Sequence, residues 1–208
     1  IAEVLAEVGG EFVCAAAGPN LEAVLAAHGS GAVKHSLKHG DDQTILNVDI
    51  GGGTSKIALI RGGRIMETLA INVGSRLIAC GSDGILTRVE EAGARVAASL
   101  GLKVVVGGKL SPGEDKILAE KLAALLFEVM QQQPLSDLAK SLMITPEPTY
   151  RGPVDLVVYS GGVAEFIYGE EGQTFGDLGS WVGKAVESNQ REWGVAVGLP
   201  TERIRATV

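Results

Sequence analysis

The sequence predicts an α/β fold, and three observations support that prediction. Two apolar segments separated by glycines, ILNVDIGGGTSKIALI over 45–60, are followed by a third near 64–73, which is typical of an antiparallel meander. The stretch from 87 to 143 has helical periodicity. A further apolar strand in VDLVVYSGG, 154–162, leads into more helix. Strands on both sides of a helical stretch indicate a sheet with helices packed on it.

Composition narrows the class of protein. The chain has 208 residues, of which 46% are hydrophobic and 21% charged, so it can form one large domain or two small ones. Its net charge of −7 argues against a nucleic-acid partner. No apolar run approaches the ~20 residues that a transmembrane helix needs, so we expect no membrane partner.

The elements can be placed more closely at the amino-terminal side. Residues 19–28 are predicted to be a helix that begins at Pro19 and ends at Gly29, and the connection 28–42 is predicted to be irregular. The apolar face of this helix is expected to consist of Leu21, Val24 and Leu25. The strand 45–50 alternates, which places Leu46, Val48 and Ile50 on one face and Ile45, Asn47 and Asp49 on the other.

The middle and carboxyl-terminal parts are predicted to be mainly helical. Helices are expected at 87–100, from the capping pattern Ser111–Glu114 to a point before Pro134, and near 135–143 and 177–187. Leucines and a valine form the apolar face of the long second helix, namely Leu118, Leu122, Leu125, Leu126 and Val129. The segment KVVVGG, 103–108, is expected to be a short strand. Trp181 and Trp193 are expected in the core.

Cysteines and histidines give weak signals. Cys14 and Cys80 are far apart in apolar surroundings and are expected to be buried free thiols. The three histidines, His28, His35 and His39, lie close together in the sequence. Solvent exposure is favoured for them, with a metal site as the alternative.

The glycine run is the most informative motif. A hairpin with Gly51, Gly52 and Gly53 at its tip lets main-chain N–H groups approach a phosphate without side chains in the way. Asp49 precedes the run, where a carboxylate can hold a cation or its waters, and Thr54 offers a hydroxyl. A plain hairpin turn is the alternative. No Walker-type sequence is present.

A second glycine motif follows the strand near 154–160. Gly161 and Gly162 stand between that strand and a predicted helix, which is a common position for a ligand-binding turn. A plain strand-to-helix turn with close packing is the alternative, and taken alone it is the favoured one.

Several segments, taken together, resemble the actin, Hsp70 and sugar-kinase ATPase superfamily. DIGGGTSKIALIRGG is similar to its second phosphate loop, AGPNLEAVLAAHGSG to its connecting helix, and VYSGGVAEFIYG to its adenosine-binding turn. Within that superfamily the sequence most resembles the ethanolamine-utilisation reactivating factors, in the segments INVGSRLI, LTRVEEAGARVAASLGL and FGDLGSWVGKAV. Members of that family are ATP-dependent chaperones of the adenosylcobalamin enzyme ethanolamine ammonia-lyase.

The resemblance implies a fold, a site and a partner. The fold would be one ribonuclease H-like half of an actin-like ATPase, with residues 1–40 a remnant of the first half plus the connecting helix. Residues 41–208 would be the nucleotide-binding domain, with a helical insertion near 84–150. ATP and Mg²⁺ would be the cofactors. Asp49 would approach Mg²⁺ through water, Gly51–Gly53 and Thr54 would hold phosphates, and Gly161 and Gly162 would lie against the nucleoside.

The same resemblance implies release of damaged cobalamin from ethanolamine ammonia-lyase in the cytoplasm, in association with a bacterial microcompartment. Three alternatives stay open: a diol-dehydratase reactivase, a small-molecule kinase of the same fold, and an actin-like structural protein. A kinase would need a substrate base, normally an aspartate, in the cleft between the two halves, and the sequence does not assign one.

The chain departs from the superfamily pattern in two places. Where many members carry a second aspartate two residues after the threonine, this sequence has Lys56, which cannot coordinate Mg²⁺. Either metal binding depends on Asp49, or Lys56 points elsewhere or meets phosphate. The first phosphate loop is missing, and the chain opens with IAEVLAEVGG and ends with RIRATV. We therefore expect a piece of a longer protein whose ATPase activity belongs to the full length.

Overall fold

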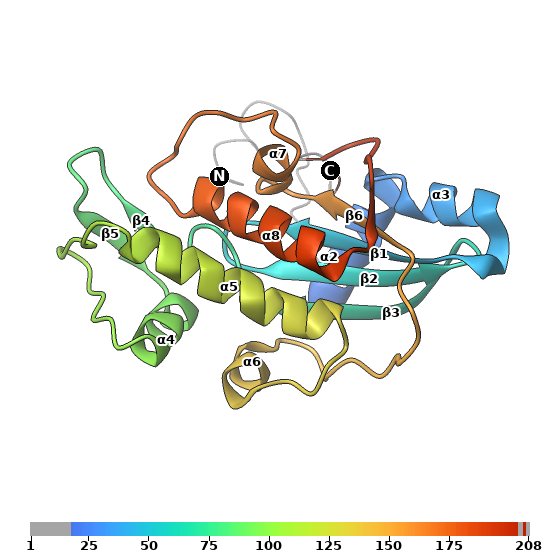
Figure 1. Ribbon diagram of the computed structural model, residues 1–208, viewed down its shortest axis with the longest axis horizontal. Coiled ribbons are helices and arrows are strands. Elements are labelled where there is room, and N and C mark those ends of the chain that lie inside the picture. Colours follow the sequence, from blue (N-terminus) through green and yellow to red (C-terminus); the bar gives the residue numbers. More distant parts are fainter. Residues whose placement is uncertain (1–17, 204–205, 207–208) are drawn as a thin grey trace, which may run out of the picture.

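The computed structural model describes residues 18–203 and 206 (Figure 1). Residues 1–17, which include Cys14 and the first part of the segment 1–40 predicted to be a remnant of a first half plus the connecting helix, lie outside these residues. The elements, in chain order, are α2 (Pro19–Gly29), α3 (Ala32–His39), η1 (Gly40–Asp42), β1 (Thr44–Ile50), β2 (Ser55–Arg61), β3 (Arg64–Ile71), β4 (Ile78–Cys80), β5 (Leu86–Val89), α4 (Glu91–Ser99), α5 (Glu114–Met130), α6 (Asp137–Leu142), β6 (Leu156–Ser160), α7 (Ala164–Ile167), α8 (Gly179–Trp193) and β7 (Ala196–Gly198).

Five strands of the described chain form one mixed sheet in the order β3-β2-β1-β6-β7. The strands β1, β2 and β3 pair antiparallel, as the predicted meander requires, whereas β6 and β7 run parallel to β1. A three-strand meander followed by parallel strands that return through helices is the arrangement of a ribonuclease H-like half. The α/β fold class is confirmed.

Helices cover both faces of this sheet. Alternate residues of β1, Leu46, Val48 and Ile50, belong to a large core with α5 and α8, which run side by side across one face (Figure 1). On the opposite face Ile45 packs with Ala27 of α2 and with α3. All seven residues of β1 are therefore buried. The predicted alternation is confirmed, and it places Asn47 and Asp49 on the face that α2 and α3 cover.

Helix α2 begins at Pro19 as predicted, but the predicted apolar face is wrong. Its buried residues are alanines, and Leu21 and Leu25 are 52% and 42% exposed. The helix lies close against β2 and β3, where only small side chains fit beneath it. Hydrophobicity alone selected the leucines and missed this requirement for small residues.

The segment 28–42 is not irregular, because α3 and η1 occupy most of it. Gly31, with φ +80°, precedes α3, which buries Ala32 and Ser36 one turn apart. The lysines and histidines of its exposed side hid that short periodicity. His35 and His39 stack with ring centroids 4.2 Å apart, and the described residues contain no cluster able to hold a metal ion.

Two further boundary predictions are corrected. Residues 103–108 form no strand: Gly107 and Gly108 exchange backbone hydrogen bonds with Leu86 and so close the end of β5 instead. The predicted helix 87–100 begins later, at Glu91, because β5 takes its first residues. The last long helix, α8, extends beyond the predicted 187 to Trp193.

The long helix α5 agrees with the sequence. Every residue of its predicted apolar face is buried, and the helix ends at Met130, before Pro134. Trp181 and Trp193 are partly buried against the same core. Cys80 is a free thiol as predicted, but it is only partly buried rather than buried. No helix in the described ranges combines the length and apolarity needed to cross a membrane. The domain division at residue 40 and the insertion near 84–150 remain predictions.

Candidate functional site

The glycine run forms the predicted hairpin tip. The β1–β2 ladder ends at the pair Ile50 and Ser55, and the N–H of Gly51 donates a 3.0 Å hydrogen bond to the carbonyl of Thr54. Gly51, Gly52 and Gly53 therefore project beyond the sheet at the carboxyl end of β1. This part of the prediction is confirmed.

The loop after β3 fixes the carbonyl groups of that tip. The N–H of Ser75 donates to Gly51 O at 3.1 Å, and the N–H of Arg76 donates to Gly52 O at 2.6 Å. By contrast, no residue in the described ranges accepts a hydrogen bond from the N–H of Gly52, Gly53 or Thr54. The tip thus presents unpaired donors together, which is the arrangement that binds an anion.

The three glycines differ in the space around them. A Cβ at Gly53 would have no atom within 4 Å, whereas a Cβ at Gly52 would lie 3.4 Å from the side chain of Arg76. Packing within the described chain therefore does not require glycine at 53. An unoccupied approach to the backbone is what a phosphate needs at this position.

The second glycine turn lies beside the first. Strands β1 and β6 are parallel neighbours, so their carboxyl ends meet at one edge of the sheet, where ligands bind in open α/β folds. The N–H of Val163 donates a 3.2 Å hydrogen bond to Ile50 O. This bond holds the two glycine turns side by side, although they are more than 100 residues apart in the sequence.

Gly161 and Gly162 differ in whether the fold requires glycine at their positions. Gly161 has φ +84°, and a Cβ there would lie 2.5 Å from Ile50 O, so the fold itself requires glycine. Gly162 has no such constraint, because a Cβ there would have no neighbour within 4 Å. Of the pair, Gly162 is the one whose missing side chain leaves room for a ligand.

Asp49 is buried at the end of β1, with 6% of its surface exposed. Ser160 Oγ donates a 2.9 Å hydrogen bond to its Oδ1. Burial raises the pKa of the Asp49 carboxyl; the Ser160 hydrogen bond and the charge of Lys56 act in the lowering direction, and Glu22 in the raising direction. Such a carboxylate gains from a nearby cation.

Lys56 lies opposite Asp49 in the β1–β2 register, on the same face of the sheet. Its Nζ is 2.7 Å from Glu22 Oε2 on α2. The ammonium group therefore points toward α2 and is not a replacement metal ligand. The sequence left its direction open.

Sequence reasoning missed two residues of this region. Ser160 is fully buried beside Asp49, and the parallel register that places it there is not visible in sequence. Arg76 packs against Gly52 and lies 3.8 Å from Asp177. It belongs to INVGSRLI, a segment whose composition alone does not indicate a contact with the glycine run.

Two cavities bear on the site, and one of them lies at the hairpin tip. Gly53 and Thr54 line one of about 430 Å³, whose other walls include Arg88 and Arg95. These arginines form ion pairs with Glu90 and Glu91. This cavity brings Gly53 and Thr54 together, whereas Asp49, Gly161 and Gly162 are not among its lining residues.

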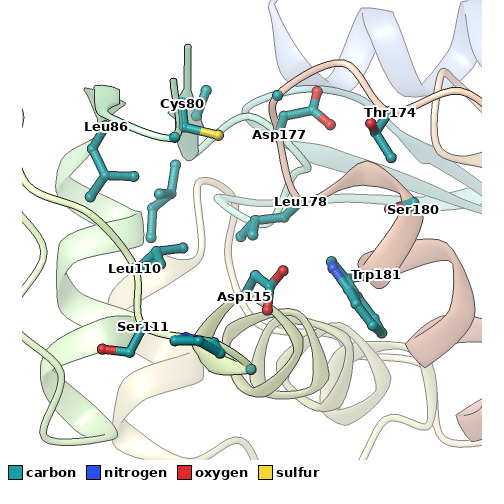
Figure 2. A pocket seen from close by; sticks show the side chains of 16 residues that line it. Cys80, Leu86, Leu110, Ser111, Asp115, Thr174, Asp177, Leu178, Ser180 and Trp181 are labelled. Carbon is teal, nitrogen blue, oxygen red and sulfur yellow. The ribbon is translucent and has the colours of Figure 1, made fainter. Parts of the chain in front are cut away.

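The other cavity, of about 410 Å³, lies between β4, β5 and the amino-terminal ends of α5 and α8 (Figure 2). Trp181, Leu110 and Leu178 give it an apolar lining, and Asp115 and Asp177 add negative charge. No lysine or arginine of the described chain lines it. This cavity does not suit a phosphate, and none of the predicted site residues lies in it.

Comparison with known proteins gives a clear family match. The family model described as ethanolamine utilisation protein EutA matches residues 1–208. The chain is 33% identical over 201 residues to the ethanolamine ammonia-lyase reactivase EutA of Salmonella typhimurium, and 32% identical over 206 residues to that of Escherichia coli. Each match includes 96% of this chain but only 42% of the relative, so the chain spans less than half of the relatives' length.

Solved structures with a similar trace are more distant. Ethanolamine utilisation protein EutJ from Carboxydothermus hydrogenoformans is 20% identical, with a TM-score of 0.38 over 89% of this chain and 51% of that chain. MreB 5 of Spiroplasma citri, bound to AMPPNP, is 16% identical, with a TM-score of 0.42 over 89% of this chain and 55% of that chain.

Proposed function

Because the chain belongs to the EutA family of ethanolamine utilisation proteins, we propose that it supplies half of the ATP site of a factor that reactivates ethanolamine ammonia-lyase. The names of the two curated relatives support the reactivation role. ATP dependence and the release of damaged cobalamin are the finer parts of the proposal. They extend to the whole protein, of which this chain represents a part.

One observation supports the nucleotide role most directly. At the hairpin tip the carbonyls of Gly51 and Gly52 are hydrogen-bonded, while the N–H groups of Gly52, Gly53 and Thr54 have no acceptor within the described residues. A simple hairpin turn does not require that its carbonyl groups be hydrogen-bonded while its N–H groups stay unpaired. Oriented amides with open space above Gly53 fit a polyphosphate.

The remaining residues fit ATP with Mg²⁺. The amides of Gly52 and Gly53 and the hydroxyl of Thr54 would hold phosphate oxygens. Asp49 would hold the cation through water, because a buried carboxylate beside a phosphate site is a suitable oxygen ligand for magnesium. Gly162 would let the nucleoside approach the backbone, and Gly161 would shape the turn. The bound nucleotide would supply the phosphoanhydride bond.

Reactivation would require that the nucleotide bind two conformations of the whole protein with different affinity. Only differential affinity can shift a conformational equilibrium. In this proposal the phosphate contacts at Gly52 and Gly53 favour a closed state, and closure acts on the partner enzyme so that damaged cobalamin leaves. Location in the cytoplasm beside a bacterial microcompartment belongs to the same proposal.

The test uses the full-length protein and ethanolamine ammonia-lyase inactivated during turnover. We expect activity to recover with Mg²⁺ and ATP and not with ADP. Asp49→Ala should abolish the recovery, while Asp42→Ala, which removes an exposed carboxylate, should leave it unchanged. Recovery without nucleotide, or unchanged recovery with Asp49→Ala, would refute the proposal. Rescue of a diol dehydratase instead would change the assigned partner.

A further inference from the structure

A buried row of polar side chains leads to Asp49 across the face of the sheet that α2 and α3 cover. Asn47 and Asp49 are two residues apart on β1 and so share that face, and Ser160 is opposite Asp49 on β6. Ser30, directly after α2, completes the row. All four residues are at most 6% exposed. Buried polar side chains of this kind are retained when they are hydrogen-bonded to one another.

The hydrogen bonds in this row all run in one direction. Ser30 Oγ donates to Asn47 Oδ1 at 2.6 Å, Asn47 Nδ2 donates to Ser160 Oγ at 3.5 Å, and Ser160 Oγ donates to Asp49 Oδ1 at 2.9 Å. A hydroxyl group has one proton to donate. Because Asn47 donates to the Ser160 oxygen, the Ser160 proton remains for Asp49. Ser30 Oγ also lies 3.3 Å from Ala27 O, but the shorter 2.6 Å contact gives its proton to Asn47 Oδ1. The Asn47 amide therefore turns its Nδ2 toward Ser160.

The two oxygens of Asp49 therefore differ. Ser160 holds Oδ1, whereas no side chain of residues 18–203 or 206 donates a hydrogen bond to Oδ2. A carboxylate fixed through one oxygen cannot rotate freely, so the direction of the other oxygen is set. Ordering of a ligand group before binding reduces the entropy lost on binding.

We infer that Ser160 is a positioning residue for Asp49, held in place by Asn47 and Ser30, and that it aims Asp49 Oδ2 at the hydrated cation of a bound nucleotide. This inference rests on the proposed function. Three successive hydrogen bonds thus connect Ser30, at the end of α2, with Asp49 at the proposed cation site. Ser160 itself is not required to touch the nucleotide.

The test is calorimetric titration of the full-length protein with ATP, first in excess EDTA and then at a series of MgCl₂ concentrations. Ser160→Ala should raise the Mg²⁺ concentration that gives half of the affinity gain roughly tenfold, which is the worth of one hydrogen bond to a charged group. Binding in EDTA should not change. Ser160→Thr keeps the hydroxyl and should restore the parent value.

Controls separate this role from loss of a buried hydroxyl. Ser36 is also fully buried, and its Oγ accepts a hydrogen bond from the N–H of Gly63, far from Asp49 in the register. Ser36→Ala should keep the parent Mg²⁺ dependence. Ser30→Ala, at the far end of the row, should shift it in the same direction as Ser160→Ala but less. It also provides a measurement if Ser160→Ala does not fold.

The outcomes are distinct. If Asp49→Ala removes the Mg²⁺-dependent gain while Ser160→Ala and Ser30→Ala both keep it, the positioning role is wrong and the proposed function stands. If Asp49→Ala itself keeps the gain, Asp49 has no cation role, and both the proposed function and this inference are overturned.

Discussion

The N–H of Val163 donates a 3.2 Å hydrogen bond to the carbonyl of Ile50. Ile50 is the last residue of β1 before the first glycine turn, and Val163 directly follows the second. One backbone bond thus fixes the distance between two turns that the sequence separates by a helical stretch. It also brings the Ile50 backbone so close to residue 161 that any side chain there would collide with it.

The first prediction concerns Gly161 and Gly162. Gly161→Ala should destabilise the chain by more than about 2 kcal/mol, because φ +84° is costly for alanine and its Cβ would lie 2.5 Å from Ile50 O. Gly162→Ala should change stability by less than about 0.5 kcal/mol, since no atom lies within 4 Å of its Cβ. Denaturant unfolding of both variants measures the difference.

The same pair separates structure from ligand binding. In the full-length protein, Gly162→Ala should weaken ATP binding although its stability is near that of the parent. Gly53→Ala, which is equally open, should behave in the same way. Normal ATP affinity in both stable variants would show that the open space above these glycines is not a nucleotide site.

The second prediction concerns Asp49. Burial raises the pKa of this carboxyl, so the folded state binds a proton more tightly than the unfolded state does. Its ionisation therefore costs stability once the pH is above the unfolded value. Asp49→Asn should stabilise the chain at pH 7 by on the order of 1 kcal/mol, because a neutral amide is cheaper to bury than a charge.

Thermal unfolding of Asp49→Asn beside Asp42→Asn checks this expectation. Asp42 is exposed, so its replacement should leave the unfolding temperature nearly unchanged. The Asp49 variant should also lose Mg²⁺-dependent ATP binding in the full-length protein. A less stable Asp49→Asn would mean that the hydrogen bond from Ser160 and the positive charge of Lys56 outweigh the cost of burying the charge.

The strand pattern and the glycines predicted the meander and its tip correctly, because both depend on local sequence. Period-two alternation placed Asp49 on the face opposite Leu46, and three glycines between apolar strands favour a turn. The position of Ser160 could not be predicted in this way. It depends on the register between β1 and β6, which is set by packing across the whole sheet.

The errors have a similar origin. Leu21 and Leu25 were expected in the core because they are apolar, yet tight packing of α2 selects alanines instead. Gly161 and Gly162 look alike in sequence, and only the position of Ile50 O separates a structural glycine from an open one. Local sequence specifies elements, whereas contacts between distant elements decide which residues form the site.

The third prediction concerns Tyr168. Burial raises its pKa to about 12; its hydroxyl donates to Gly198 O at 2.9 Å and accepts from the N–H of Tyr159. Above its ordinary value of 10.0 the unfolded chain loses this proton, while the folded chain keeps it. The free energy of unfolding should therefore fall as the pH rises from about 10 to about 12.

Tyr168→Phe should flatten that decline by up to ~1.4 kcal/mol per pH unit, although it is less stable at pH 7 through loss of two hydrogen bonds. Denaturant midpoints from pH 8 to pH 11.5 measure the slope. Tyr150→Phe is the control at a tyrosine on another part of the surface. An unchanged slope in Tyr168→Phe would show that this phenol does not control the alkaline limit.

The fourth prediction concerns this chain by itself. It should bind ATP with Mg²⁺ weakly and hydrolyse it negligibly, because the resemblance implies two phosphate loops and the sequence contains one such hairpin. The amides of Gly52, Gly53 and Thr54 would donate hydrogen bonds to one side of the phosphate chain. Without donors on the other side, several kcal/mol of phosphate binding and the alignment for in-line attack are missing. Calorimetric titration and a phosphate-release assay, with the full-length protein measured in parallel, test this. Sub-micromolar affinity with full-length turnover would mean that the residues of this chain form a complete ATPase site.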